Sequence, residues 1–439
     1  MAIIKPFRGY RYNQDKIEHP GEVMAPPYDS LSDEQTDSCY DLNPYNAARL
    51  VSQRTYETDT ETDNCYSRAK GFLKTWIEDK ILIKEDKKSF YIYEQTITVN
   101  REKFYNRGII GLLELTDYSE GSVVPCEKPS TDSKIDRMHM IKATQANNSL
   151  VSCMYTDEDK KLSALLAEIA ESPAEMDFVT ENDGIAHKLW VINDEETVSY
   201  IENALISKKM FIVDGHNRYE AGLDYKNECK KSPCYTGNES YNYIMALISD
   251  SNEDGRVQLP VHRLLSNEKN LNEAFVIAGL QDNFRIEKII VDKMDDDFSE
   301  TLRKQISTQR KETVFAMYTG DDYFYRFTFK NKKYLDEIMP DASDVYKSLD
   351  LCVLNKLVFE EQLNMDSEND TRIEYTRSLS DGVKSVDMGE YSCLFAMNPV
   401  RGWQFDELTA TSELLPKRSV SIFPKPATGI VIHKFTTEI

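Results

Sequence analysis

The chain has 439 residues, 40% of them hydrophobic and 10% aromatic, which is enough apolar material for packed cores and too long for one small domain. Its 53 basic and 75 acidic residues give a formal net charge of −22 at pH 7. The acidic excess is spread along the sequence, and no stretch rich in lysine and arginine with interleaved aromatic residues stands out. These features predict a globular protein of two or three domains. They argue against sequence-independent binding to nucleic acid and against an anionic membrane surface as partner.

The cysteines and histidines show no metal-binding pattern. Eight cysteines are scattered along the chain without a C-x-x-C pair, and the six histidines include no H-E-x-x-H arrangement. We therefore expect reduced thiols and no structural zinc site. The N-terminus lacks the apolar core of a signal peptide, and no apolar run approaches the length that spans a membrane. A cytoplasmic location is expected.

Hydrophobic periodicity predicts alternating strands and helices in the N-terminal region. Alternating apolar and β-branched residues indicate strands, and apolar residues three and four apart indicate helices. The expected strands are 2–7, 90–99, 106–115, 150–155, 188–193, 210–213 and 241–249, and the expected helices are 65–81, 137–145, 162–170, 195–206, 218–225 and one that begins at Ser32. The charged turn at 100–103 predicts a hairpin between the second and third of these strands.

A polar segment at 266–272 predicts a domain boundary, which divides the chain into a region 1–266 and a C-terminal domain 267–439. The pattern beyond the boundary again mixes helices and strands. The expected helices are 271–280, 298–309 and 349–363, and the expected strands are 284–291, 314–318, 323–329, 392–398 and a terminal strand over 423–435. The predicted fold class is α/β, of the α+β kind.

Residues 211–221, Phe-Ile-Val-Asp-Gly-His-Asn-Arg-Tyr-Glu-Ala, join an apolar strand to a helix through a glycine-containing turn. Such a turn presents backbone N–H groups at the positive end of the helix dipole, which suits a phosphate at Gly215. Arg218 offers a planar charged fork, His216 can donate or shuttle a proton, and Asp214 can hold a metal ion or accept a proton. In the structural alternative, Asp214 caps the helix, Arg218 pairs with a glutamate of the same helix, and His216 has no role.

Glu127 lies in a loop over 125–131 that is bracketed by prolines, between a cysteine and a lysine. A carboxylate there is a candidate general base for a substrate hydroxyl, if it lies within hydrogen-bond reach of that group. The alternative is a solvated surface turn. The chain has no Walker-type G-x-x-x-x-G-K-[ST], no G-x-G-x-x-G and no G-x-S-x-G. A nucleotide would therefore be bound by a less common framework.

Two further stretches are candidates for anion binding. His262 and Arg263, at the end of an apolar run, are typical of an anion site, although His262 equally suits a satisfied core position. Near the C-terminus, Lys417, Arg418 and Lys425 form an unusually basic stretch for so acidic a chain. The positive electrostatic potential of such a cluster would attract an anionic ligand. The alternative is a strand edge protected by lysine.

Motifs that together carry a family resemblance are spread over the whole chain. They are Ile4-Lys5-Pro6-Phe7-Arg8-Gly9-Tyr10-Arg11-Tyr12, Ala25-Pro26-Pro27-Tyr28-Asp29, Arg107-Gly108, Asp136-Arg137-Met138, Asp214-Gly215-His216-Asn217-Arg218-Tyr219-Glu220, Pro416-Lys417-Arg418-Ser419 and Phe423-Pro424-Lys425. Jointly they resemble a widespread bacterial family, domain-of-unknown-function family 1015. That family has no settled activity to carry over.

The D-G-x-x-R strand–turn–helix also resembles the signature of the ParB/sulfiredoxin superfamily. In that superfamily the loop binds nucleotide phosphates, and one branch comprises kinases of free L-serine whose base is an acidic residue on an earlier loop. The resemblance implies a ParB-like core in the N-terminal region, with Glu127 in the place of that base. Relatives tend to carry His-His-Arg where this chain has His216-Asn217-Arg218, and His-Glu where it has Cys126-Glu127. No histidine role is therefore expected at positions 126 and 217.

The expected function is that of a nucleotide-dependent phosphotransferase that forms O-phosphoserine from free L-serine. Gly215 and Arg218 would hold the transferring phosphoryl group, Mg²⁺ on Asp214 would neutralise charge, and Glu127 would accept the hydroxyl proton. Lys425, like Lys417, is expected to close the site from the second domain. A nucleotide and a small metabolite are the expected partners. The alternatives are a non-catalytic nucleotide- or metabolite-binding regulator and a phosphatase of a small phosphorylated metabolite.

Overall fold

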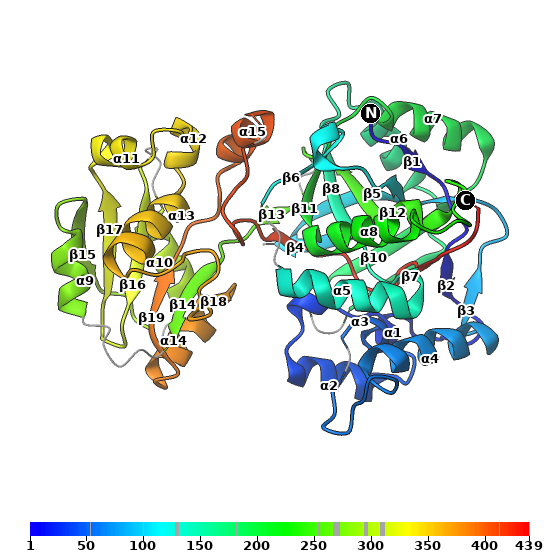
Figure 1. Cartoon of the computed structure of the whole chain (residues 1–439), viewed down its shortest axis with the longest axis horizontal. Coiled ribbons are helices and arrows are strands. Elements are labelled where there is room, and N and C mark those ends of the chain that lie inside the picture. The colour runs from blue at the N-terminus through cyan, green and yellow to red at the C-terminus, as the bar shows by residue number, and fades with distance from the viewer. Residues whose placement is uncertain are drawn as a thin grey trace. The chain divides into compact units, whose positions relative to one another are not determined.

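The computed structural model describes residues 1–52, 54–99, 101–127, 131–180, 183–252, 255–266, 273–293, 297–307, 312–411 and 413–438. They form two compact units of mixed helices and strands, which confirms the α+β class (Figure 1). The first unit contains residues 1–125, 129–257 and 422–439, and the second contains 126–128 and 258–421.

The first unit is built on a large mixed sheet (Figure 1). Its strands follow the order β6-β11-β8-β12-β5-β4-β10-β9, and β1 pairs with β5. Their bounds are β1 (Ile4–Lys5), β4 (Phe90–Val99), β5 (Glu102–Glu114), β6 (Val123–Pro125), β8 (Val151–Tyr155), β9 (Met176–Val179), β10 (Ala186–Ile192), β11 (Met210–Asp214) and β12 (Tyr243–Asp250). The pairs β6–β11 and β8–β12 are parallel, and the other pairs along the sheet are antiparallel.

Both faces of this sheet are covered, because successive residues of a strand point to opposite faces and both sets are apolar. In β4, Phe90 and Ile92 belong to one core cluster, while Tyr91 and Tyr93 belong to the other. The first face packs against α6 (Lys161–Ile169), α7 (Glu195–Leu205) and α8 (His216–Cys229), and the second against α3 (Ala48–Val51) and α4 (Cys65–Glu78). The unit also contains the α-helices α1 (Pro20–Val23), α2 (Asp33–Leu42) and α5 (Thr131–Thr144), and short 3₁₀ helices at Tyr28–Ser30, Tyr118–Glu120 and Ser240–Asn242. Its other strands are β2 (Tyr10–Tyr12), β3 (Leu82–Lys84), β7 (Ala146–Asn147), β20 (Ile422–Phe423) and β21 (His433–Lys434), and β13 (Val257–Gln258) spans the sequence boundary between the units.

The second unit is an antiparallel sheet in the order β15-β17-β16-β19-β14-β18, with helices packed on its two faces. Its strands are β14 (His262–Ser266), β15 (Phe284–Ile289), β16 (Val314–Tyr318), β17 (Phe324–Phe329), β18 (Ile373–Thr376) and β19 (Tyr391–Ala396). Its helices are α9 (Glu273–Leu280), α10 (Phe298–Ile306), α11 (Lys332–Ile338), α12 (Asp344–Lys347), α13 (Asp350–Val353), α14 (Leu379–Asp387), α15 (Gly402–Thr411) and a π-helix, Leu354–Gln362.

Periodicity locates most of the long elements correctly. The strand 90–99 coincides with β4, and it forms the predicted hairpin with β5, although Asn100 of the turn lies outside the described residues. The helix start at Ser32 is confirmed by a capping box, in which Ser32 accepts from the Gln35 amide and Gln35 accepts from the Ser32 amide. The predicted helix 349–363 divides into α13 and the π-helix.

The prediction of one terminal strand over 423–435 is wrong. Only the short strands β20 and β21 form there, and the segment between them contains Pro424, Pro426 and Gly429, which has a φ of 99°. Proline cannot donate to a strand ladder, and this glycine turns the backbone away from the extended conformation.

The two units also differ from a linear division at residue 266. β14 pairs with β18 and β19 and so belongs to the second unit, and the C-terminal segment 422–439 belongs to the first. Hydrogen bonding between strands far apart in the sequence decides both assignments.

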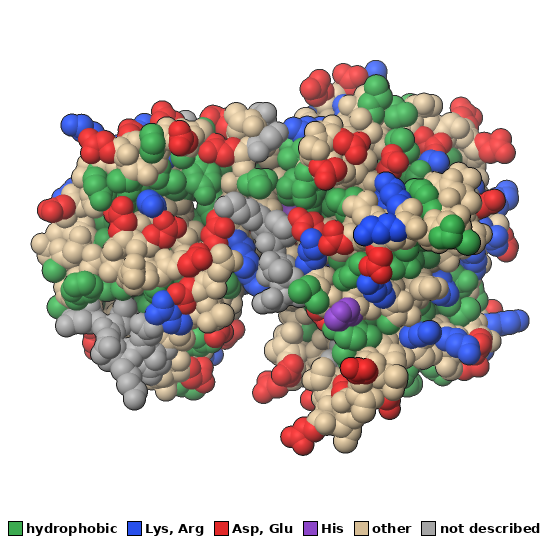
Figure 2. All heavy atoms as spheres, viewed as in Figure 1, with side chains coloured by type: hydrophobic (Ala, Val, Ile, Leu, Met, Phe, Trp, Pro, Cys, Tyr) green, Lys and Arg blue, Asp and Glu red, His purple; other side chains and the backbone are tan. Residues whose placement is uncertain are grey.

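On the face shown in Figure 2, acidic side chains are scattered over both units and interspersed with basic ones, as the sequence predicts. Within the described part of the chain, no helix is both long enough and apolar enough to cross a membrane.

Candidate functional site

The strand–turn–helix predicted around Asp214 is confirmed. β11 runs parallel to β6 and antiparallel to β8, ends at Asp214, and is followed by Gly215 and α8. Gly215 is the N-cap of α8 with a φ of 87°, in the left-handed region, and it provides no side-chain cap. The first turn of a helix leaves backbone amides without an intrahelical acceptor, and it carries the positive end of the helix dipole.

A second constraint at Gly215 comes from the side chain of Arg218. A Cβ at position 215 would lie 3.0 Å from Arg218 Nε and 3.1 Å from its Cζ. The guanidinium therefore occupies the space beside the glycine, folded back onto the turn that begins its own helix. Glycine is required here both for the backbone angle and for this close approach.

Four charged side chains form what we call the ionic cluster: Asp29, Asp214, Arg218 and Lys425. Arg218 Nη2 donates to Asp214 Oδ2 at 2.7 Å, and Lys425 Nζ donates to Asp214 Oδ1 at 3.0 Å. Lys425 Nζ also donates to Asp29 Oδ2 at 2.5 Å. The Arg218, Lys425 and Asp214 side chains are 8%, 10% and 17% exposed and are held largely out of water, whereas Asp29 is 33% exposed.

Arg218 is only partly satisfied by these contacts. Its Nη1 donates to the carbonyl of Leu150, but its Nε is buried and has no hydrogen-bond acceptor among the described residues. A buried donor without an acceptor costs free energy, and such groups are concentrated where a ligand supplies the missing partner.

Aromatic and cationic groups surround the cluster. The Tyr28 ring lies under two guanidinium groups, with Arg137 Cζ 3.7 Å and Arg218 Cζ 5.8 Å from its centroid. Burial raises the pKa of Tyr28, although Arg218 and Arg137 oppose that shift. Arg137 is itself oriented by Asp136 and by the carbonyl of Val51. Tyr28 therefore remains a neutral phenol beside the cations.

The structure brings together motifs that are far apart in the sequence. The ionic cluster and its neighbours come from 25–29, 136–138, 214–218 and 423–425, all within the first unit. Lys425, expected from a second domain, contacts Asp214 within the first unit. Asp29 and Arg137 were not predicted as site residues. The signal that could have found them is their place in the motifs that carry the family resemblance.

His216 lies at the first position of α8 and is buried. Its Nε2 is 2.9 Å from the carbonyl oxygen of Ile212, so this nitrogen carries the proton and donates. Burial lowers the pKa of His216 to about 4, although Asp214 opposes the shift. The imidazole is therefore neutral at pH 7 and hydrogen-bonded to the backbone of β11, the strand that precedes its helix. A catalytic role for His216 stays a prediction.

Glu127 belongs to the second unit, where it supports a loop. Its Oε2 accepts from the amides of Ser419 at 2.9 Å and Val420 at 3.3 Å, and the amide of Leu415 donates to the Cys126 carbonyl beside it. The role of Glu127 as a base stays a prediction.

The other anion-site candidates also lie in the second unit. His262 Nδ1 accepts from the amide of Met397, as in the satisfied core alternative. Buried Arg263 donates to the carbonyls of Val261 and Arg418, and Lys417 Nζ donates to the Glu368 carbonyl. These contacts hold the segment 417–418. Anion binding by His262, Arg263 and Lys417 stays a prediction.

Four buried histidines make stability depend on pH. Burial lowers the pKa of His187 and His216 to about 4, and that of His262 and His433 to about 3. In the unfolded chain each takes up a proton near pH 6.5, so their contribution is fully present above that pH and is lost as pH falls toward 4. We expect a loss of roughly 1–2 kcal/mol per histidine between pH 7 and pH 5.

Urea unfolding at pH 7 and pH 5 measures this loss. In His262→Asn the amide oxygen can still accept from the Met397 amide, but the side chain no longer titrates. The free energy of unfolding of this variant should change less with pH than that of the native chain. Equal pH dependence in the two proteins would contradict the assignment.

The ionic cluster also offers oxygen ligands. Asp29 and Asp214 are carboxylates of the kind that Mg²⁺ prefers, and both are bonded to the same ammonium of Lys425. Among the described residues no group of three or more His, Cys, Asp or Glu side chains is arranged to hold a metal. The donor set therefore fits only a Mg²⁺ ion that arrives with phosphate oxygens, since Mg²⁺ commonly uses one or two carboxylates together with those.

Comparison with known proteins gives weak structural neighbours. A free serine kinase in complex with AMP is 12% identical with a TM-score of 0.33, and the match covers 69% of this chain and 83% of that chain. A conserved hypothetical protein from Pyrococcus furiosus is 12% identical with a TM-score of 0.32, and the match covers 69% and 87%. SbnI with a C-terminal truncation, from Staphylococcus aureus, is 8% identical with a TM-score of 0.33, and the match covers 74% and 82%. Matches at this level carry no inference about function.

No curated protein matches the chain. The profile of a family described as "Protein of unknown function (DUF1015)" matches residues 4–352. The match includes the motifs at 25–29, 136–138 and 214–220 and agrees with the resemblance that they carry, whereas the motifs at 416–419 and 423–425 lie beyond it. It extends over most of the chain, and the protein belongs to the DUF1015 family.

Proposed function

We propose that the protein is a nucleotide-dependent phosphotransferase that acts on a small hydroxylated metabolite, with free L-serine as the first acceptor to test. The observation that carries the proposal is the ionic cluster at the N-terminal end of α8, where Arg218 and Lys425 share Asp214. The choice of serine rests on the resemblance of the D-G-x-x-R turn to that of free L-serine kinases, and a ParB-like core remains part of the proposal.

Phosphate chemistry suits this cluster for a physical reason. Arg218 and Lys425 have only carboxylates and a carbonyl as acceptors, and Arg218 Nε has none among the described residues. A phosphoryl group would supply several acceptor oxygens to both cations and to the helix N-terminus. Asp214 would then be released from part of its ion pairing, so that it could hold Mg²⁺ or a proton. Glu127 is proposed as the base for the substrate hydroxyl.

A second candidate is a non-catalytic regulator that binds a nucleotide or metabolite at the same cluster. The side chains of His216 and Glu127 favour it, because both are already engaged by backbone groups. A general base must be able to reach the proton that it accepts. A phosphatase of a small phosphorylated metabolite would use the same cations with water as acceptor.

One experiment separates these functions. The chain is screened by thermal shift with ADP, ATP and AMP, each with Mg²⁺, in the presence and absence of serine and phosphoserine, and the same mixtures are assayed for product. A ligand that binds only the folded state raises the melting temperature. Phosphoserine formation supports the kinase, binding without turnover supports the regulator, and phosphate release without nucleotide supports the phosphatase. The absence of any nucleotide shift would contradict both nucleotide-binding candidates.

Lys425→Met should weaken nucleotide binding by about 10-fold or more, since a charge-assisted hydrogen bond is worth about 1.5–3 kcal/mol. The matched control is Lys188→Met on β10, which removes a lysine of the same unit that pairs with Asp177 at 3.4 Å. Isothermal titration with the nucleotide that gives the largest shift measures both variants. Equal affinities in the Lys425 and Lys188 variants would remove Lys425 from the site.

A further inference from the structure

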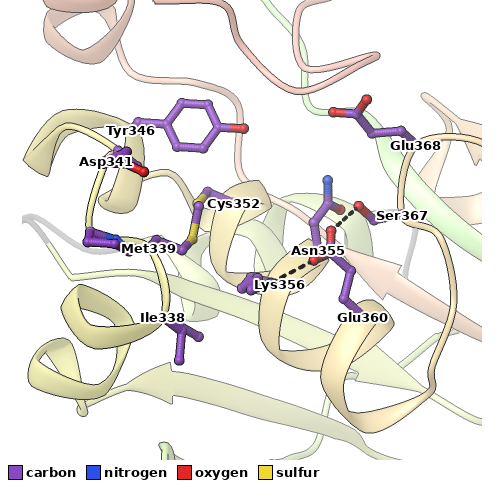
Figure 3. A pocket seen from close by; sticks show the side chains of 12 residues that line it. Ile338, Met339, Asp341, Tyr346, Cys352, Asn355, Lys356, Glu360, Ser367 and Glu368 are labelled. Atoms are coloured by element: carbon purple, nitrogen blue, oxygen red, sulfur yellow. Dashed lines mark hydrogen bonds and ion pairs between the residues drawn. The ribbon is translucent and has the colours of Figure 1, made fainter.

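The second unit contains a pocket of about 360 Å³, and of the side chains and carbonyls discussed above only those of Glu368 belong to its lining. It lies between the end of α11, α12, the π-helix and the loop at 367–368 (Figure 3). Its lining residues are Ile338, Met339, Pro340, Asp341, Ala342, Tyr346, Cys352, Asn355, Lys356, Glu360, Ser367 and Glu368. A pocket of this volume lies at the lower end of the range for sites that hold small molecules.

The charged residues of the lining are mostly acidic. Glu360 accepts from Lys356 Nζ at 3.0 Å and from Ser367 Oγ at 2.8 Å, so the one lining cation is already paired. Asp341 and Glu368 add two further carboxylates. Three carboxylates against the Lys356 ammonium, with the Lys417 ammonium bonded to the Glu368 carbonyl nearby, leave an excess of one negative charge at the pocket, within a chain whose net charge is −22. This field favours a positively charged occupant.

Polar and aromatic groups face the same space. Figure 3 shows the Tyr346 ring and the Glu368 carboxylate on opposite sides of the pocket, with the Asn355 amide between them. Burial raises the pKa of Tyr346, and Cys352 and Glu368 raise it further, so this phenol stays neutral. A neutral phenol and an amide oxygen accept hydrogen bonds from an ammonium, and an aromatic ring attracts a cation through its face.

The rest of the pocket wall is apolar. Ile338, Met339, Pro340, Ala342 and the buried thiol of Cys352 form it. Such a wall suits a few methylene groups and offers no partner for a second polar end of the ligand. The pocket thus combines an acidic, hydrogen-bonding side with an aliphatic side.

The helix beneath the pocket has an unusual geometry. Asn355, Lys356 and Glu360 all lie on the π-helix Leu354–Gln362. π-helical turns are rare, and they are frequent at functional sites, where they aim side chains that a regular helix would place elsewhere. Three of the polar lining residues therefore come from the segment whose backbone departs from the α-helix.

We propose that this pocket binds a small aliphatic amine, with its ammonium group between Glu368, Asn355 and Tyr346 and its methylene chain against the apolar wall. The inference is independent of the proposed phosphotransferase function, because it uses none of the residues to which that function is assigned. The pocket would give the protein a second ligand of opposite charge to a nucleotide.

Isothermal titration of the full chain with propylamine and with butylamine tests the proposal, against butanol and an equal ionic strength of sodium chloride. We expect saturable binding of the amines and none of butanol. Glu368→Gln should weaken amine binding by about 10-fold, as expected when a charged acceptor is made neutral. Because Glu368 holds Lys417 through its backbone carbonyl, Glu368→Gln leaves that contact in place.

The matched control is Glu407→Gln on α15, an exposed carboxylate of the same unit outside the pocket. It removes one negative charge and should leave amine affinity unchanged within two-fold. Ala342→Trp fills the pocket without changing charge and should abolish binding, with folding checked by its melting temperature and circular dichroism. Failure of the native chain to bind either amine, or an equal loss in Glu407→Gln and Glu368→Gln, would overturn the proposal.

Discussion

Replacing Arg218 with methionine is expected to lower the free energy of unfolding by about 3 kcal/mol, because it removes one partner of a buried ion pair. Asp214 would keep Lys425 but lose the guanidinium at 2.7 Å, and the Leu150 carbonyl would lose its donor. Methionine keeps much of the side-chain volume, so the loss reports the polar contacts. Urea unfolding at pH 7 measures it.

Arg218→Lys separates the charge from the geometry. Lysine keeps the positive charge but cannot form the planar fork, so we expect a loss of about 1–3 kcal/mol in stability and a comparable loss in nucleotide affinity. A double-mutant cycle of Arg218→Met with Asp214→Asn gives the coupling between the two side chains. If Arg218→Met leaves stability unchanged while nucleotide affinity falls, Arg218 serves the ligand and not the fold. The reverse result would make it a structural residue.

Gly215→Ala is expected to cost about 2 kcal/mol, more than an ordinary glycine with a positive φ. An alanine at a φ of 87° is strained by about 1 kcal/mol, and its Cβ would also lie 3.0 Å from Arg218 Nε. The guanidinium must then move away from Asp214 or from the turn. We therefore expect nucleotide affinity to fall as well, since the same movement displaces the proposed phosphate-binding group.

Gly237→Ala is the matched control. Gly237 has a φ of 91°, close to that of Gly215, but a Cβ there would meet no atom within 4 Å. Its replacement should cost only the backbone strain of about 1 kcal/mol and leave nucleotide affinity unchanged. Chemical denaturation and titration of both variants give the two quantities. If the two alanine variants lose the same stability, the contact between Gly215 and Arg218 contributes nothing beyond the backbone angle.

The strand–turn–helix around Asp214 shows what local sequence can predict. An apolar run over 210–213, a glycine and then helical periodicity specify β11, the turn and the start of α8, because each depends on residues within a few positions. The hairpin of β4 and β5 is predictable for the same reason. The phosphate hypothesis also arises there, since it follows from residue types that adjoin one another at a helix N-terminus.

Contacts between distant segments could not be predicted in this way. The alternative partners for Arg218 were glutamates of its own helix, whereas the structure pairs it with Asp214, the last residue of the preceding strand. Lys425 was expected to act from another domain, and it lies beside Asp214 and Asp29 in the first unit. Neither pairing can be inferred from the spacing of residues in the sequence, because each depends on how the sheet and the C-terminal segment are arranged.

The sequence by itself determined the mixed α/β class, most of the long strands and helices, and the glycine turn that opens α8, because periodicity and turn residues act locally. Only the tertiary structure decided which charges meet. It brought Asp29, Asp214, Arg218 and Lys425 into one cluster, and it buried His216 against its own strand. The reason is that these contacts depend on long-range interactions, namely the pairing of β6, β11 and β8 and the packing of the segment 422–439 in the first unit. The residues of one segment do not indicate which distant segment it will contact.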